Sequence, residues 1–229
     1  QRDVRGLVLR GSHHLPPEIP AYIQRLVGKD FSSTDLSYIQ QGERALQRAL
    51  SILQHPPSWQ AEPDAGAAVS SAVLPGLGRV FRVEAVLAAP LGWLHRQLFE
   101  ELEQMPRWNP TLSRVEVLQR PGEDTLVTHE VTSASPVGRR DFVSVRHRRR
   151  TQAAVYLVGT ATRLERLPAQ EEGPSPPETP LLRPSILTLW VLFFPQGWIP
   201  SAVTDRVLPR CQADFIGHLR RHLSATARC

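Results

Sequence analysis

Two oppositely charged residues lie inside apolar stretches of the sequence, where a charged side chain needs a partner. Glu130 lies in the run 126–131 and Arg146 in the run 142–146. A buried unpaired charge is costly, whereas a carboxylate and a guanidinium that hydrogen-bond each other make burial tolerable. If the two runs are paired antiparallel strands, the two charges can face each other inside a cavity. Alternation alone leaves open the alternative that both side chains project into solvent.

The sequence gives no support for catalysis. Glu130 and Asp141 can be considered as a general acid and base, but no nucleophile or phosphate-binding loop accompanies them. The chain contains none of the motifs G-x-x-x-x-G-K-[ST], G-x-G-x-x-G, H-E-x-x-H, C-x-x-C and G-x-S-x-G. We therefore expect a protein that is not an enzyme and that uses no cofactor.

The histidines do not group as metal ligands. His218 and His222 are four residues apart, a spacing at which two helical histidines can share a metal ion, but no third ligand is evident nearby. We interpret both as ordinary surface histidines of a C-terminal helix. The sequence therefore predicts no metal site.

The basic residues are nearly all arginines. Lys29 is the only lysine among 27 basic residues, and with 22 acidic residues the net charge is +5. Such a chain suits an anionic partner, either nucleic acid or an acidic lipid surface. The one dense cluster, 146–150, is either the solvated end of a strand or a patch that binds the phosphates of lipids or nucleic acid.

The length and the cysteines limit the class of protein. A chain of 229 residues can form one globular domain whose core needs no disulfide or structural metal. Cys211 and Cys229 cannot form a disulfide framework, which excludes a secreted disulfide scaffold and favours a reducing compartment. The longest apolar run, 186–194, is far shorter than the roughly 20 residues of a membrane-spanning helix. We therefore expect no transmembrane helix.

Periodic apolar residues predict three helices and a series of strands. Three- and four-residue spacing predicts helices over 33–55, over 90–105 and from Ile199 to near the C-terminus, the last with a kink at Pro209. The segment 164–184 contains six prolines and is predicted to be a loop. Alternation or apolar runs predict strands over 68–74, 81–87, 112–119, 125–132, 141–149, 153–162 and 185–194.

The order of these elements is typical of an α+β fold. It predicts one curved antiparallel sheet whose concave side is covered by the long C-terminal helix. Such an arrangement encloses an apolar tunnel, which is filled either by side chains or by a ligand. Residues 31–229 are expected to form this domain. Residues 1–30 are interpreted as a leader or linker, either the remainder of a mitochondrial targeting sequence or a plain disordered arm.

Several motifs, in the correct order, resemble the START family of lipid-transfer domains. The resemblance runs from about residue 30 to the C-terminus and is carried by Leu36 to Glu43, Gly78 to Glu84, Trp108-Asn109-Pro110, Thr128-His129-Glu130, Arg140 to Arg146, Gly197 to Pro200 and Asp214 to Arg220. It implies a helix-grip fold, a single sterol bound in the tunnel, and delivery of cholesterol to mitochondria for steroid synthesis. It implies binding and transfer rather than catalysis.

The resemblance also implies where the sterol binds. Glu130 and Arg146 match the family's buried acid–arginine pair, which is associated with the sterol hydroxyl, and Arg140 matches the arginine before the following strand. Because a sterol has a rigid apolar body and one hydroxyl, the rest of its pocket must be apolar wall. The expected wall residues, which have ordinary core packing as their alternative role, are Leu126, Val143, Cys211, Phe215 and Leu219.

This chain departs from the family pattern after Thr162. Where the family has a further strand, the chain has a shorter Pro-rich segment, 171–184, which indicates a sheet that is one strand short. The expected protein is a monomer that carries cholesterol or a related sterol and does not bind nucleic acid. It is expected at mitochondria, exposed to the cytosol on the anionic outer-membrane surface. The alternative is a START-like module that has lost sterol transfer and binds membrane or another protein.

Overall fold

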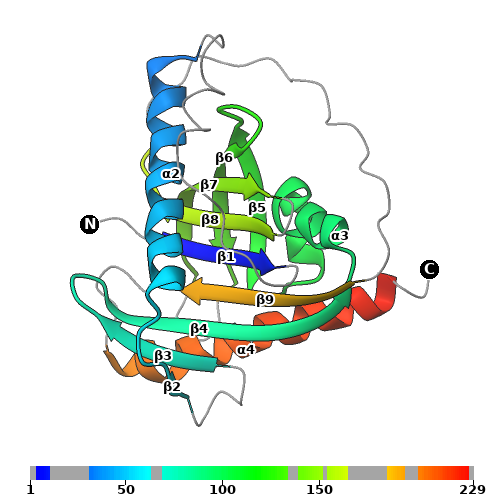
Figure 1. Cartoon of the computed structure of the whole chain (residues 1–229). Coiled ribbons are helices and arrows are strands. Elements are labelled where there is room, and N and C mark those ends of the chain that lie inside the picture. Colours follow the sequence, from blue (N-terminus) through cyan, green and yellow to red (C-terminus); the bar gives the residue numbers. More distant parts are fainter. Residues whose placement is uncertain are drawn as a thin grey trace.

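The computed structural model describes residues 4–10, 31–62, 69–133, 139–151, 154–164, 185–193 and 201–226. Its central element is a nine-stranded sheet with the strand order β2-β3-β4-β9-β1-β8-β7-β6-β5. Every pair of neighbouring strands in this sheet is antiparallel. In Figure 1 the helix α2 (Ser33–Gln54) crosses in front of the sheet, and the helix α4 (Ser201–Thr226) lies behind β3 and β4. The α+β prediction is therefore confirmed.

The strands agree closely with the segments that alternation predicted. Only β2, a two-residue strand, and β1 were not expected. Their bounds are β1 Val4–Arg10, β2 Gln60–Ala61, β3 Val69–Leu74, β4 Gly78–Ala89, β5 Leu112–Gln119, β6 Thr125–Thr132, β7 Asp141–Arg150, β8 Ala154–Ala161 and β9 Ser185–Phe193.

The helix predicted over 90–105 is divided into three short segments. They are α3 (Leu91–His95), a wider π-helical turn η2 (Arg96–Glu100) and a tighter 3-10 segment η3 (Leu102–Arg107). The Glu101 N–H bonds to the Arg96 carbonyl at 2.8 Å, which is the i to i−5 pattern of a π turn. In contrast, α4 continues through Pro209. Among the described residues, no helix combines the length and the apolar character needed to cross a membrane.

Strand β8 shows that the sheet separates two hydrophobic cores. Ala154, Tyr156 and Val158 pack in one cluster with residues of α2. The alternating residues Val155 and Leu157 belong to a larger cluster that includes residues of α4 and of the segments α3 to η3. Because successive residues of a strand face opposite sides of a sheet, α2 and α4 cover opposite faces.

Helix α2 is fixed to the sheet at its first turn. The Ser32 hydroxyl accepts a hydrogen bond from the Asp35 N–H at 3.1 Å and caps the helix. Asp35 in turn accepts a hydrogen bond from the Gln119 side chain of β5 at 2.6 Å. The helix ends at Gln54, and the prolines Pro56 and Pro57 follow closely. These contacts position α2 across the face of the sheet opposite α4.

Strand β1 lies in the segment that the sequence analysis assigned to a leader or linker. Val4–Arg10 instead occupies the middle of the sheet, between β8 and β9 (Figure 1). Its partners β8 and β9 lie far from it in the sequence, so no local pattern indicates this pairing. The segment 171–184, in which a family strand was expected to be missing, lies outside the described residues, as do residues 1–3 and 11–30. The domain boundary at residue 31 stays a prediction.

Candidate functional site

The side chains of Glu130 and Arg146 meet diagonally across two neighbouring strands. Glu130 lies on β6 and is 1% exposed, and Arg146 lies on β7. The Arg146 Nε and Nη2 groups both donate to Glu130 Oε1, at 2.9 and 2.6 Å. The Thr128 hydroxyl donates to the same oxygen at 2.9 Å. Of the two alternatives that alternation left open, the structure adopts the inward-facing one.

This ion pair borders the apolar core that α4 covers. The strand register places Arg146 opposite Leu126, which is 1% exposed and belongs to that core. Glu130 lies four residues after Leu126 on the same strand and therefore shares its face. Leu219 of α4 is fully buried in the same cluster. The arrangement combines a large apolar surface with one polar end, at which a ligand hydroxyl can be hydrogen-bonded directly or through water.

The predicted residues of α4 differ in how deeply they are buried. Leu219 is a core residue, and Phe215 is partly buried against the same core, with its ring centroid 5.9 Å from that of Trp108. Cys211 is only half-buried. Burial raises the pKa of the Cys211 thiol, and the negative charge of Asp214 raises it further, so the thiol stays neutral. The structure therefore brings Leu126, Phe215 and Leu219 together in one apolar cluster.

Val143 does not belong to this cluster. It packs on the α2 face of the sheet, beside Tyr38, Val127 and Val145. Val143 and Arg146 are three residues apart on one strand, and an odd spacing places two strand residues on opposite faces. Its assignment as a wall residue opposite α4 is therefore wrong.

Arg140 lies at the loop end of the hairpin formed by β6 and β7, just before β7 begins. Its N–H donates to the Thr132 hydroxyl at 2.8 Å, and its carbonyl accepts a hydrogen bond from the Thr132 N–H at 2.8 Å. These main-chain contacts close the end of the hairpin. Arg140 precedes Phe142, the residue paired with Glu130, by two positions. The structure thus places Arg140 beyond the ion pair along the same face.

The sequence model of a protein family described as "START domain" matches residues 39–229 of this chain. The chain belongs to the START domain family. It is 41% identical over 220 residues to "Steroidogenic acute regulatory protein, mitochondrial" of Gallus gallus, which covers 90% of this chain and 78% of that protein. It is 38% identical over 225 residues to the protein of the same name of Homo sapiens, which covers 87% and 76%. The family resemblance read from the sequence motifs is confirmed.

Solved structures show the same fold at lower sequence identity. "Human StAR-related lipid transfer protein 5" superposes with a TM-score of 0.66 at 18% identity, over 84% of this chain and 99% of that one. A "STAR-related lipid transfer protein" fragment from Xanthomonas axonopodis superposes with a TM-score of 0.53 at 18% identity, over 73% of this chain and 99% of that one. The helix-grip fold expected from the resemblance is therefore confirmed for this START domain.

The arginine cluster of the START domain is not a solvated surface patch. Arg146 and Arg148 lie on the α4 face of β7, whereas His147 and Arg149 lie on the α2 face. Only Arg150, at the end of the strand, is exposed. Both surface alternatives for this cluster are therefore wrong for its inner members. Alternation within the predicted strand was the signal that could have indicated this.

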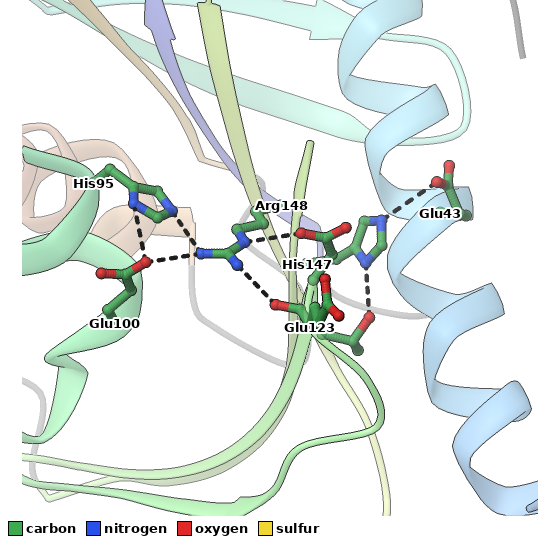
Figure 2. A network of polar contacts seen from close by, with 8 residues as sticks. Glu43, His95, Glu100, Glu123, His147 and Arg148 are labelled. Atoms are coloured by element: carbon green, nitrogen blue, oxygen red, sulfur yellow. Dashed lines mark hydrogen bonds and ion pairs between the residues drawn. The ribbon is translucent and has the colours of Figure 1, made fainter. Parts of the chain in front are cut away.

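Arg148 joins the sheet to the segment α3–η2 and to the turn between β5 and β6, as Figure 2 shows. It is 7% exposed. Its Nε donates to Asp124 at 2.9 Å, its Nη1 to Glu100 at 3.1 Å, and its Nη2 to the Glu123 carbonyl at 2.9 Å. The Nη1 group also lies 2.9 Å from His95 Nε2. A cation in this position cannot serve as a lipid contact.

His95 is held in its neutral form mainly by its burial, with Arg148 acting in the same direction. Burial lowers the pKa of His95 to about 4, the charges of Arg148 and Arg150 lower it, and Glu100 and Asp124 oppose them. Neutral His95 can accept the Arg148 hydrogen bond at Nε2, while its Nδ1 lies 3.4 Å from Glu100. No pattern in the sequence indicated this buried histidine.

Glu43 of α2 forms the corresponding contact on the other face. Arg149 Nη2 donates to both of its carboxylate oxygens, at 2.8 and 2.6 Å, and His147 Nε2 lies 3.3 Å away. Burial alone would raise the pKa of Glu43, but the hydrogen bonds from His147 and Arg149 lower it overall. His147 also contacts Thr125 on β6 at 2.9 Å. The consecutive β7 residues His147, Arg148 and Arg149 thus hold α2 on one face of the sheet and the segment α3–η2 on the other.

His222 is enclosed by aromatic rings rather than exposed on α4. It stacks on Trp108 at 5.2 Å with an interplanar angle of 4°, and it lies 5.3 Å from Trp93. Its Nε2 is 2.7 Å from Gln97 Oε1. This cluster connects the last turns of α4 to the segments α3 to η3. No group of His, Cys, Asp and Glu in the described part of the chain could hold a metal ion.

Proposed function

We propose that this START domain binds one sterol, with cholesterol as the expected ligand, between the sheet and α4. The observation that carries the proposal is the ion pair between buried Glu130 and partly buried Arg146 at the border of a large apolar core. The sterol body would contact the apolar residues Leu126, Phe215 and Leu219. Its hydroxyl would lie at the ion pair.

The chemistry of the pair suits a single alcohol group. The Glu130 oxygen that receives the Arg146 bonds also receives the Thr128 hydroxyl, so the carboxylate is held in one orientation. A polar end that is already hydrogen-bonded needs little rearrangement when a ligand arrives. A ligand without a hydroxyl would leave this polar end in contact with apolar atoms, which is unfavourable.

The names of the relatives support the setting of this function. The relatives of Gallus gallus and Homo sapiens are named as steroidogenic and mitochondrial, and the solved human structure is named as a lipid transfer protein. On this basis we propose sterol transfer that supports steroid hormone synthesis at mitochondria. The proposal further takes the chain to act as a monomer on the anionic outer-membrane surface. The net charge of +5 favours contact with such a surface. Neither the site nor the relatives' names point to catalysis.

A titration with a fluorescent sterol tests the proposal. The wild-type chain should bind saturably with one sterol per chain. Glu130→Gln and Arg146→Ala should each weaken binding by at least about tenfold, because each removes the opposite charge from its former partner beside the ligand. The sterol affinity of Arg146→Lys should lie between that of these two variants and that of the wild type, because lysine keeps the charge but not the planar guanidinium.

An exposed ion pair of the same composition provides the matched control. Arg114 and Glu116 on β5 form an ion pair at 2.7 Å, with side chains 61% and 42% exposed. Arg114→Ala and Glu116→Gln should bind the sterol like the wild type. The absence of saturable binding to the wild type would refute the proposal, and so would equal binding by folded variants of the buried pair.

A further inference from the structure

Strand β1 is bonded along both of its edges. Its residues pair with β8 from Val4↔Thr160 to Arg10↔Ala154, and with β9 from Arg5↔Phe193 to Arg10↔Thr188. It is therefore an interior strand, although it lies near the start of the chain. Residues 11–30, between β1 and the capping residue of α2, lie outside the described residues.

The strands on either side of β1 have no direct pairing with each other. Strands β8 and β9 are both antiparallel to β1, so they run parallel to each other with one strand position between them. Without β1, each would present a free edge of N–H and C=O groups in the middle of the sheet. Such an edge is a template for an extended chain.

The gap would also open both hydrophobic cores. Leu7 and Leu9 of β1 are register partners of Leu157 and Val155, which are buried on the α4 side. Val8 is the partner of Tyr156, which is fully buried on the α2 side. Water at this position would reach the two clusters that hold α2 and α4. An occupant between β8 and β9 therefore stabilises both clusters by keeping water out of this position.

We propose that the space between β8 and β9 is a strand-binding site whose occupant is the chain's own segment Val4–Arg10, bound in cis. The site recognises an extended backbone that pairs antiparallel on both sides. Removal of the segment Val4–Arg10 would take an interior strand out of the sheet and expose the site. This proposal does not depend on which ligand the domain carries.

Peptide binding to a shortened chain tests the site directly. A chain without residues 1–12 should bind a fluorescent peptide of residues 1–12 saturably and with one peptide per chain, whereas the intact chain should not bind it. A Val8→Pro peptide should bind at least about tenfold more weakly, because proline cannot donate to the ladder and clashes within it. Equal binding of the peptide by the intact and the shortened chain would overturn the proposal.

The intact chain allows the same test through proline substitution. Val8→Pro should lower the melting temperature and speed up hydrogen exchange in β8 and β9, whereas Ser12→Pro, after the end of β1, should change neither. Unchanged exchange in β8 and β9 of the Val8→Pro variant would also overturn the proposal. This readout does not involve a sterol, so its failure is distinct from failure of the proposed function.

A cross-link tests the register and the cis arrangement. With Cys211 and Cys229 replaced by serine, Leu9→Cys with Val155→Cys should form a disulfide, because directly paired strand residues have Cα atoms within disulfide range. Leu9→Cys with Leu157→Cys, which is two residues out of register, should not. Equal cross-linking of both pairs would contradict the register. A disulfide-linked dimer would show that β1 comes from a second copy and would overturn binding in cis.

Discussion

Arg148 is a buried cation that the fold holds through contacts to two other segments, α3–η2 and the turn between β5 and β6. Its partners Asp124 and Glu100 are 34% and 25% exposed, whereas the Arg148 side chain is 7% exposed. Arg148→Ala leaves these carboxylates and the Glu123 carbonyl without the guanidinium. We expect a loss of about 3 kcal/mol in the free energy of unfolding, at the low end for a broken buried ion pair because the partners retain some water.

Urea unfolding of matched variants measures this effect. Arg150→Ala removes an exposed arginine from the end of the same strand and should change the free energy of unfolding by no more than about 1 kcal/mol. Equal losses in the Arg148 and Arg150 variants would show that the buried network contributes little.

His95 makes the stability of this domain depend on pH. Its pKa is about 4 in the folded chain, against 6.5 for an ordinary histidine. The unfolded chain therefore binds a proton at a pH at which the folded chain does not. The contribution of neutral His95 is fully present above pH 6.5 and is lost as the pH falls towards 4, by about 3 kcal/mol in total.

Unfolding measured between pH 7 and 4 checks this dependence. His95→Gln keeps an acceptor for Arg148 but does not titrate, so its stability should fall less steeply over this interval. Identical pH profiles for the variant and the wild type would assign the acid sensitivity to other groups.

Gly42 shows how closely α2 lies against β7. A Cβ atom at this position would lie 2.5 Å from His147 Cβ and 2.7 Å from His147 Cγ. Alanine has the higher helix propensity by about 1 kcal/mol, but the overlap would push α2 away from the sheet. Gly42→Ala should therefore lower the free energy of unfolding by about 1 to 3 kcal/mol.

Gly92 is the matched control for this substitution. It lies in α3, and a Cβ atom there would have no neighbour within 4 Å. Gly92→Ala should be neutral or stabilising in thermal and urea unfolding. If both alanine variants were equally stable, the close contact between α2 and β7 would not be tight in solution.

The elements differ in how far the sequence could predict them. The pattern around Glu130 and Arg146 left both orientations of their side chains open, and the resemblance to the START family was what favoured the buried pair. The face of Val143 was readable, since it is an odd number of residues from Arg146. Strand β1 was not, because its partners are distant in the sequence. His95 was hidden for the same reason: its neighbour Arg148 comes from another part of the chain.

The whole molecule consists of two cores that one sheet keeps apart. The core on the α2 side contains Tyr156 and the contacts of Gly42 and Glu43, and the core on the other side contains Leu126 and Leu219. A ligand bound beside Glu130 would contact only the second core. Binding and α2 packing should then contribute independently to the stability of the domain.

This independence gives the last prediction. Sterol at 100 times its dissociation constant should stabilise the wild type by about 2.7 kcal/mol, because it binds only the folded chain. Gly42→Ala should have a lower free energy of unfolding without sterol, but sterol should raise it by the same amount as in the wild type. The reason is that effects at distant sites without shared partners add to within about 0.5 kcal/mol. Glu130→Gln should gain less. Urea unfolding with and without sterol measures all three increments, and a reduced increment in Gly42→Ala would mean that the sheet transmits the packing of α2 to the sterol site.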